Sequence, residues 1–172
     1  MISKKVCVLG SFSVGKTSLT GRYVHSVFSD RYLSTIGVKI SKKELICDSL
    51  PSVTLVIWDL EGRDIYTNIN VSHLRGASGF FVVADGTRNE TLDEALNIRA
   101  LALEVIGADA PNYLLINKSD LLCEWEIVDK QLEAIAQKGV KAIKTSAKTG
   151  DSVNAAFEAL GRDMLIKEGI IS

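Results

Sequence analysis

The sequence predicts an α/β fold: a doubly wound, mostly parallel sheet with helices on both faces. Three observations support it. Short apolar runs recur along the chain, amphipathic stretches separate them, and a glycine loop follows the first run. Unalternating apolar runs are typical of strands buried on both faces, and strands that alternate with helices form doubly wound sheets. At 172 residues, we expect one domain over residues 1–172.

The predicted strands are these apolar runs and one alternating segment. The first run, Val6 to Leu9, ends in Gly10, and residues 37–47 alternate as an edge strand does. The later runs cover residues 53–58, 80–84, 113–116 and, more weakly, 142–143. Doubly wound sheets bind their ligands at the carboxyl ends of the strands. The polar residues that follow these runs are therefore candidate site residues, although each one alone can be a simple exit to solvent.

Apolar side chains at helical spacing predict helices over residues 92–106, 125–136 and 153–165, and a helical stretch follows the glycine loop. Asp151 is the expected N-cap of the last helix. The cysteines Cys7, Cys47 and Cys123 are widely spaced, with no short metal-binding or redox pattern. We expect them to be reduced core residues.

The charges of the chain nearly cancel. Lys and Arg number 20 and Asp and Glu 21, a net charge of −1, so there is no overall attraction for nucleic acid or an anionic membrane. No apolar stretch approaches the roughly 18 residues of a membrane span, and the C-terminal KEGIIS has no cysteine for prenylation. We expect a cytoplasmic chain with no nucleic-acid partner and no membrane anchor. A lipidated tail beyond this sequence would make the protein peripheral to a membrane.

Residues 10–17 read GSFSVGKT and match the phosphate-binding pattern G-x-x-x-x-G-K-[ST] between a strand and a helix. Gly10 and Gly15 allow the backbone N–H groups to turn inward around phosphate oxygens, and the helix N-terminus adds partial positive charge. Lys16 is expected at the β- and γ-phosphates, and the Thr17 hydroxyl at Mg²⁺. The alternative is a glycine turn with an exposed lysine.

Three shorter motifs follow other strands. In DLEG, residues 59–62, the Asp59 carboxylate suits Mg²⁺, through a water, and Gly62 lets a backbone N–H approach the γ-phosphate. In NKSD, residues 117–120, Asp120 can accept from guanine N1–H and the 2-amino group, a donor pair that adenine lacks. Asn117 would brace the loops, and the Lys118 stem would lie over the ring. In SAK, residues 146–148, the Ala147 N–H can donate to guanine O6.

The order GSFSVGKT, Thr35, DLEG, NKSD, SAK resembles the Ras superfamily of small GTPases over about residues 4–168. TIGVKI at 35–40, Trp58 before DLEG, and RGA followed by FFVVADGT are similar to the Rab branch, and a member of prokaryotic type is one alternative. The resemblance implies a G-domain fold of the P-loop NTPase type, with five parallel strands, one antiparallel strand and five helices.

The resemblance also implies the ligands, GTP or GDP and Mg²⁺, and the residues that bind them. Phe28 would pack on the guanine, and Thr35 would close on Mg²⁺ and the γ-phosphate, so that Thr17, Thr35 and Asp59 form the metal set. Further expected nucleotide contacts are Ser13, Val14, Ser18, Ser146 and Lys148. Residues 30–40 and 61–76 would be two switches that bind effectors, exchange factors and activating factors.

The expected reaction is in-line attack of water on the γ-phosphate, in which Lys16 stabilises charge. Three positions depart from the family pattern: Glu61 replaces a small Ala, Arg63 replaces the Gln that orients water, and Phe12 fills a slot usually given to a small residue. Guanidinium cannot accept a hydrogen bond, so we expect slow hydrolysis. Two other outcomes stay open: Glu61 takes over the role of orienting the water, or Arg63 folds over the γ-phosphate as a built-in finger. The alternatives are a pseudo-GTPase that binds without hydrolysing, and a P-loop ATPase or kinase, against which NKSD argues.

Overall fold

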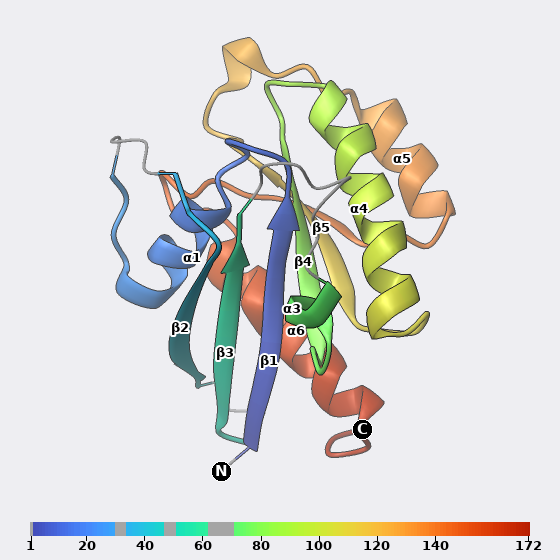
Figure 1. The fold of residues 1–172 in the computed structure, drawn as a ribbon. Coiled ribbons are helices and arrows are strands. Elements are labelled where there is room, and N and C mark those ends of the chain that lie inside the picture. The colour runs from blue at the N-terminus through green and yellow to red at the C-terminus, as the bar shows by residue number, and fades with distance from the viewer. Residues whose placement is uncertain (1, 30–33, 47–50, 62–70) are drawn as a thin grey trace.

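A computed structural model describes residues 2–29, 34–46, 51–61 and 71–172 of the chain. One six-stranded sheet forms its centre, with strand order β2-β3-β1-β4-β5-β6 (Figure 1). The strands are β1 Ile2–Gly10, β2 Val38–Leu45, β3 Val53–Leu60, β4 Gly79–Asp85, β5 Asn112–Asn117 and β6 Ala142–Lys144. Only the β2–β3 pair of this sheet is antiparallel, with Val38 opposite Leu60. The predicted six-stranded, mostly parallel sheet is confirmed.

Helices cover both faces of the sheet, as predicted. They are α1 Lys16–His25, α3 Val71–Leu74, α4 Glu90–Ile106, α5 Asp129–Gln137 and α6 Val153–Lys167. α1 and α6 pack on one face, while α3, α4 and α5 pack on the other (Figure 1). Within the described ranges, no helix is both long enough and apolar enough to cross a lipid bilayer.

The alternation of side chains along β1 builds two cores from one strand. Val6 and Val8 join the core beneath α1 and α6, whereas Cys7 and Leu9 join the core beneath α4 and α5. All four are buried, which explains why the run shows no polar alternation. Because β1, β3, β4, β5 and β6 are parallel, their carboxyl ends meet at one edge of the sheet, where every predicted motif begins.

Three local predictions are wrong. The predicted helix over 125–136 begins only at Asp129, because residues Leu122–Glu124 form a short 3₁₀ turn and the Trp125 indole donates to the Ile127 carbonyl at 2.7 Å. Asp151 is not the N-cap of α6: Ser152 holds that position in a left-handed conformation, with φ of 58° and no side-chain cap. Cys123 is exposed rather than in the core, because it lies on the 3₁₀ turn. Cys47 lies outside the described residues.

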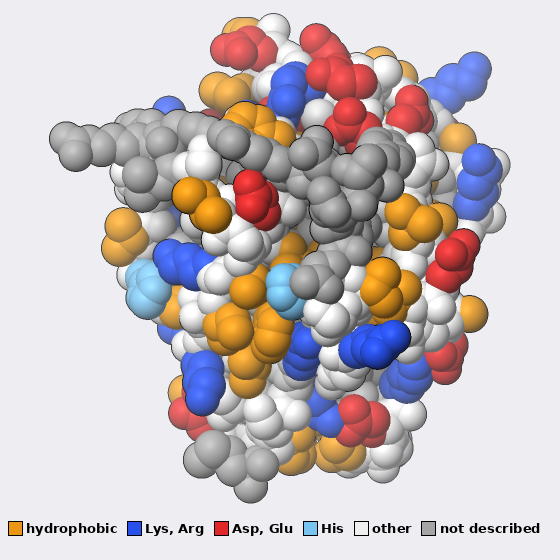
Figure 2. Space-filling model, viewed as in Figure 1, with side chains coloured by type: hydrophobic (Ala, Val, Ile, Leu, Met, Phe, Trp, Pro, Cys, Tyr) orange, Lys and Arg blue, Asp and Glu red, His pale blue; other side chains and the backbone are white. Residues whose placement is uncertain are grey.

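Apolar side chains remain exposed on the outer strand β2 and just before it. Ile36 is 88% and Ile40 50% exposed, and Figure 2 shows hydrophobic side chains gathered over β2 and β3. Beside them the Trp58 and His73 rings lie 5.9 Å apart, and Lys5 Nζ sits 3.9 Å from the centre of the Trp58 ring. This face therefore presents aromatic and aliphatic side chains, and Ile36, Ile40 and His73 among them belong to the two predicted switches.

Candidate functional site

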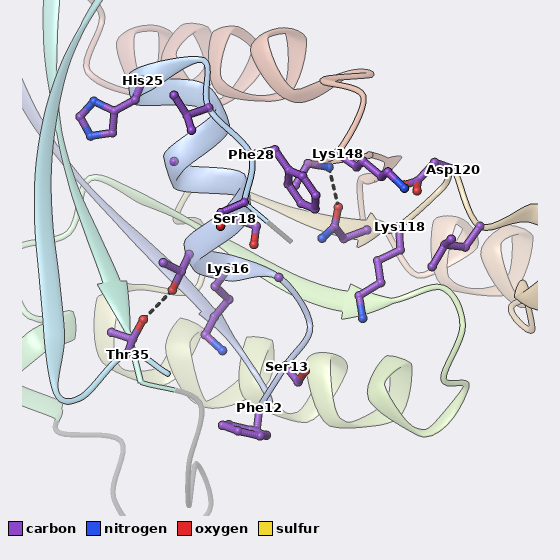
Figure 3. Close-up of a pocket in the computed structure, with 18 of the residues that line it drawn as sticks. Phe12, Ser13, Lys16, Ser18, His25, Phe28, Thr35, Lys118, Asp120 and Lys148 are labelled. Atoms are coloured by element: carbon purple, nitrogen blue, oxygen red, sulfur yellow. Dashed lines mark hydrogen bonds between the residues drawn. The ribbon is translucent and has the colours of Figure 1, made fainter. Parts of the chain in front are cut away.

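A cavity of about 450 Å³ opens at the carboxyl edge of the sheet. Its walls come from the glycine loop, α1, residues 27–29, Thr35 and the loops after β5 and β6. In Figure 3, Lys16 and Thr35 lie toward one end of this cavity, and Phe28, Asp120 and Lys148 toward the other. The predicted residues that line it are Ser13, Gly15, Lys16, Thr17, Ser18, Phe28, Thr35, Asn117, Lys118, Asp120, Ala147 and Lys148.

Three further predicted site residues contact the cavity lining without being part of it. Gly10 and Val14 support the loop from below, and Ser146 is buried behind Asp120. Gly62 and Arg63 lie outside the described residues, as do residues 30–33 and 62–70 of the two predicted switches. Residues that the sequence reasoning did not select also line the cavity, namely Gly21, His25, Val27, Ser29, Leu60 and Leu121.

The glycine loop needs glycine at both ends. Gly10 has φ of +146° and Gly15 φ of +101°, values that side chains rarely adopt. A Cβ on Gly15 would lie 2.2 Å from the Asn117 side-chain nitrogen, and one on Gly10 2.6 Å from the Val83 carbonyl oxygen. The Gly15 carbonyl accepts from Leu19 N–H at 2.9 Å, which starts α1. Both the positive φ values and the lack of room for a Cβ atom therefore require glycine at positions 10 and 15 of the motif.

Lys16 is a buried cation that closes the loop on itself. Its Nζ donates to the Gly10 carbonyl at 2.8 Å and to the Ser11 carbonyl at 2.7 Å. Burial lowers the pKa of Lys16 to about 8, although Asp59 opposes this shift. The ammonium therefore lies at the mouth of the loop with little water around it, where an anion would gain strongly from contact with it.

Three oxygen-bearing side chains meet beside Lys16. Thr17 Oγ1 lies 2.5 Å from Thr35 Oγ1 and donates to Asp59 Oδ2 at 2.6 Å, and Thr35 Oγ1 lies 3.5 Å from the same carboxylate oxygen. Asp59 is fully buried, and its Oδ1 has no hydrogen-bond partner among the described residues. Burial raises the pKa of Asp59 against the effects of the Thr17 hydrogen bond and Lys16.

This cluster fits Mg²⁺. The ion prefers hard oxygen ligands and binds proteins through one or two carboxylates together with substrate phosphates. The orphaned Asp59 oxygen and two hydroxyls within hydrogen-bonding distance provide such a partial set. In the described part of the chain, no group of three or more His, Cys, Asp or Glu side chains could hold a metal without help. Phosphate oxygens would therefore complete the site.

Asn117 joins the loops at the other end. Its Nδ2 donates to the Val14 carbonyl at 3.0 Å, and its Oδ1 accepts from Ala147 N–H at 3.1 Å. Arg22 of α1 donates to the Ala147 carbonyl at 2.8 Å. Ala147 N–H, the predicted donor to guanine O6, is thus bonded to Asn117 in this structure. Three segments distant in sequence are held at fixed spacing.

Asp120 and Ser146 form a polar pair at this end. Ser146 Oγ donates to Asp120 Oδ1 at 2.6 Å and accepts from Thr149 N–H at 3.1 Å. Asp120 lines the cavity and Ser146 is buried. The serine therefore fixes the orientation of the carboxylate, whose other oxygen, Oδ2, is not used in that bond.

Sequence reasoning missed the buried charge cluster around Asp85. The fully buried Asp85 carboxylate accepts from Lys118 Nζ at 2.6 Å and Arg88 Nε at 3.0 Å, and from Thr87 N–H and Oγ1 at 2.9 and 2.7 Å. Arg88 Nη2 then donates to the Phe12 carbonyl at 3.1 Å. Burial raises the pKa of Asp85, but these hydrogen bonds outweigh it and hold the pKa below its ordinary value.

The Asp85 cluster therefore ties the phosphate loop to the NKSD loop. The sequence feature that could have indicated this cluster is the position of Asp85, which directly follows the apolar run 80–84. Nothing in that signal identified Arg88 or Lys118 as its partners. The cluster also constrains Lys118, whose φ of +71° and ion pair fix the side chain along the cavity wall.

The chain has clear relatives among known proteins. A sequence model described as the Ras family matches residues 5–166. Ras-related protein Rab-13 from Mesocricetus auratus is 30% identical over 166 residues, which are 96% of this chain and 81% of that protein. Ras-related protein Rab-8B from Homo sapiens is 30% identical over 164 residues, 95% of this chain and 79% of that protein. Both similarities extend over nearly the whole chain.

Proposed function

The chain belongs to the Ras family of small GTPases, and we propose that it is a Mg²⁺-dependent guanine-nucleotide switch that hydrolyses GTP slowly. Family membership supports GTP binding in general terms. The assignment as a Mg²⁺-dependent guanine-nucleotide switch rests on one observation. A single cavity has the Lys16 ammonium and the Thr17–Thr35 pair toward one end, and Asp120, held by Ser146, at the other.

The base end selects guanine. An oriented Asp120 carboxylate accepts from two donors on one edge of guanine, where adenine offers no matching pair. The half-buried Phe28 packs against the core beneath α1 and lines the cavity, so its ring can cover one face of the base. On the other side, the ion pair with Asp85 holds the Lys118 stem. Binding of guanine O6 by Ala147 N–H would require that group to leave or share its bond to Asn117.

The phosphate end combines fixed dipoles with one buried cation. Gly10 and Gly15 place backbone N–H groups around the β-phosphate. Lys16, now bonded to two loop carbonyls, turns to the β- and γ-phosphates. Thr17 and Thr35 would hold Mg²⁺, with Asp59 behind them. When bound, the ion neutralises charge on the β- and γ-phosphate oxygens.

Hydrolysis is slow because the residue at the water-orienting position only donates hydrogen bonds. Arg63 has no acceptor for a water proton. The Phe12 side chain is 40% exposed at the loop, where it would crowd an arginine supplied by a partner. Intrinsic turnover should therefore lie at or below the roughly 10⁻⁴ s⁻¹ of unassisted Ras-type enzymes.

The switches would carry the nucleotide state to partner proteins. Of the predicted switch residues 30–40 and 61–76, Thr35 lines the γ-phosphate end of the cavity, and Ile36 and Ile40 after it are exposed apolar side chains. We assign effectors, exchange factors and activating factors to this surface because γ-phosphate contacts stabilise such segments in the GTP form.

Nucleotide affinity tests the proposal directly. Dissociation constants of GDP, ADP and xanthosine diphosphate are measured with the parent, Asp120→Asn, and the control Asp93→Asn on the exposed face of α4. The parent should bind GDP and not ADP. Asp120→Asn should lose GDP affinity by about 1–3 kcal/mol and prefer xanthine, whose carbonyl accepts from the new amide. Equal affinity of the parent for GDP and ADP contradicts the guanine assignment.

A single-turnover time course of GTP hydrolysis then tests the rate. Arg63→Gln should raise the rate if the water-orienting position is the limiting loss. A tenfold drop in Glu61→Ala, about 1.4 kcal/mol in barrier, with switch order unchanged, would make Glu61 catalytic. A fast parent rate that collapses in Arg63→Ala would instead show that Arg63 acts on the γ-phosphate.

A further inference from the structure

Glu61 forms an unusual pair of hydrogen bonds with Gly37 at the end of the β2–β3 ladder. The last paired residues are Val38 and Leu60, and the next pair would be Gly37 and Glu61. Glu61 N–H donates to the Gly37 carbonyl at 2.9 Å, as a backbone ladder requires. The return bond is different: Gly37 N–H donates to the Glu61 side-chain oxygen Oε2 at 2.8 Å. One residue thus binds both backbone groups of Gly37.

The conformation of Gly37 explains why a side chain is needed there. Its φ of +72° turns the chain out of the strand, so its N–H leaves the direction of the ladder. A carboxylate on a flexible stem can follow that N–H where a backbone carbonyl cannot. An alanine at position 61 has no acceptor to do this. The contact therefore depends on a residue by which this chain departs from the family pattern.

The two Glu61–Gly37 hydrogen bonds restrict the position of Thr35. Gly37 lies two residues after Thr35, whose hydroxyl is 2.5 Å from Thr17 Oγ1. Only Ile36, which is 88% exposed, separates the two fixed residues. A loop whose end is already held loses less conformational entropy when it is ordered. The negative charge also lies near the phosphate site, since Glu61 raises the pKa of Lys16 against the larger effect of burial.

We propose that Glu61 is a positioning residue that latches Gly37 and so holds Thr35 near the Mg²⁺ site in both the GDP and GTP forms. The inference rests on the proposed function and deepens it. The segment from Gly37 onward stays with β2 in either form. GTP binding then needs to order a shorter segment.

Amide hydrogen exchange of the peptide over residues 34–40 tests the latch in GDP-bound protein. Glu61→Ala should speed exchange about fivefold, the factor expected for loss of one hydrogen bond. Glu61→Gln keeps a side-chain carbonyl acceptor and should restore protection to within about twofold. The control Glu104→Ala removes an exposed carboxylate from α4 and should change nothing. Unchanged exchange in Glu61→Ala, or failure of Gln to rescue it, overturns the latch.

Affinity supplies a second readout. Glu61→Ala should weaken binding of a non-hydrolysable GTP analogue about fivefold and leave GDP within about twofold, because only the analogue requires Thr35 to be in place. Equal loss for both nucleotides would overturn the latch, as would slower hydrolysis with unchanged exchange. If the parent binds no guanine nucleotide, the proposed function fails. Amide hydrogen exchange of the nucleotide-free parent, Glu61→Ala and Glu61→Gln then still supports or overturns the Glu61–Gly37 contact.

Discussion

Raising the pH should weaken nucleotide binding through Lys16. Burial lowers the pKa of this ammonium to about 8 in the free protein; Asp59 and Glu61 oppose the shift, and Arg88 adds to it. Phosphate oxygens at the same place favour the charged form and raise the pKa in the complex. The complex therefore holds the proton more tightly than the free protein. By linkage, affinity is greatest below pH 8 and falls as the pH rises through the pKa of the free protein.

The magnitude follows from the titration of one group. The charged fraction of the free protein falls by a factor of about ten between pH 7 and pH 9, for a pKa of about 8. If the pKa in the complex returns to its ordinary value, the GDP dissociation constant should rise about tenfold over this interval, or about 1.4 kcal/mol. The change should be shallow between pH 7 and 8 and steep above pH 8.

The assay is a GDP titration at pH 7, 8 and 9 with Mg²⁺ held constant, on the parent, Lys16→Arg and Lys16→Met. Guanidinium stays charged at all three values, and methionine is never charged, so neither variant titrates at position 16. Titration of the guanine N1–H affects all three proteins alike. The parent should show the extra tenfold loss. The same pH dependence in the parent and in Lys16→Arg would refute the lowered pKa.

The lowered pKa of Lys16 also predicts a lower free energy of unfolding for the nucleotide-free protein. A lysine pKa lowered from 10.5 to about 8 makes the folded state about 3 kcal/mol less stable below pH 8 than with an ordinary lysine. The unfolded chain binds more protons between pH 8 and 10.5, so the free energy of unfolding should rise with pH across that window. Urea unfolding of nucleotide-free parent and Lys16→Met measures this: the variant should be more stable at pH 7, and the gap should narrow above pH 8.

Three further predictions follow from the site. Asp85→Asn leaves two cations beside a neutral amide and should lower the free energy of unfolding by about 2 kcal/mol, discounted for their partial exposure; an unchanged urea midpoint would contradict it. Gly15→Ala, whose Cβ would lie 2.2 Å from Asn117, should destabilise the protein by more than about 2 kcal/mol, whereas Gly21→Ala, with space in α1, should be neutral or stabilising. Thr35→Ala should weaken a GTP analogue about fivefold and spare GDP in the same titration; equal losses would show that Thr35 does not sense the γ-phosphate.

Local patterns in the sequence were sufficient for the fold and for the phosphate loop. Burial on both faces forces unbroken apolar runs such as Val6 to Leu9, and a tight anion-binding turn forces glycine at positions 10 and 15. These requirements act on residues adjacent in the chain, so a pattern over a few positions records them. The same holds for the polar residues at strand ends, because parallel strands bring those ends to one edge.

The contacts that distinguish this chain were decided by the tertiary structure. Phe12 meets Arg88, Asp85 meets Lys118, and Gly37 meets Glu61, pairs separated by up to 76 positions. Each depends on which strands are neighbours and on the direction in which each loop leaves its strand. Irregular loops have no periodicity, and a charged residue has the same letter whether it is solvated or buried. The partner of Asp85 or Glu61 is therefore fixed only when packing brings the loops within hydrogen-bonding distance and removes the water that would otherwise solvate those carboxylates.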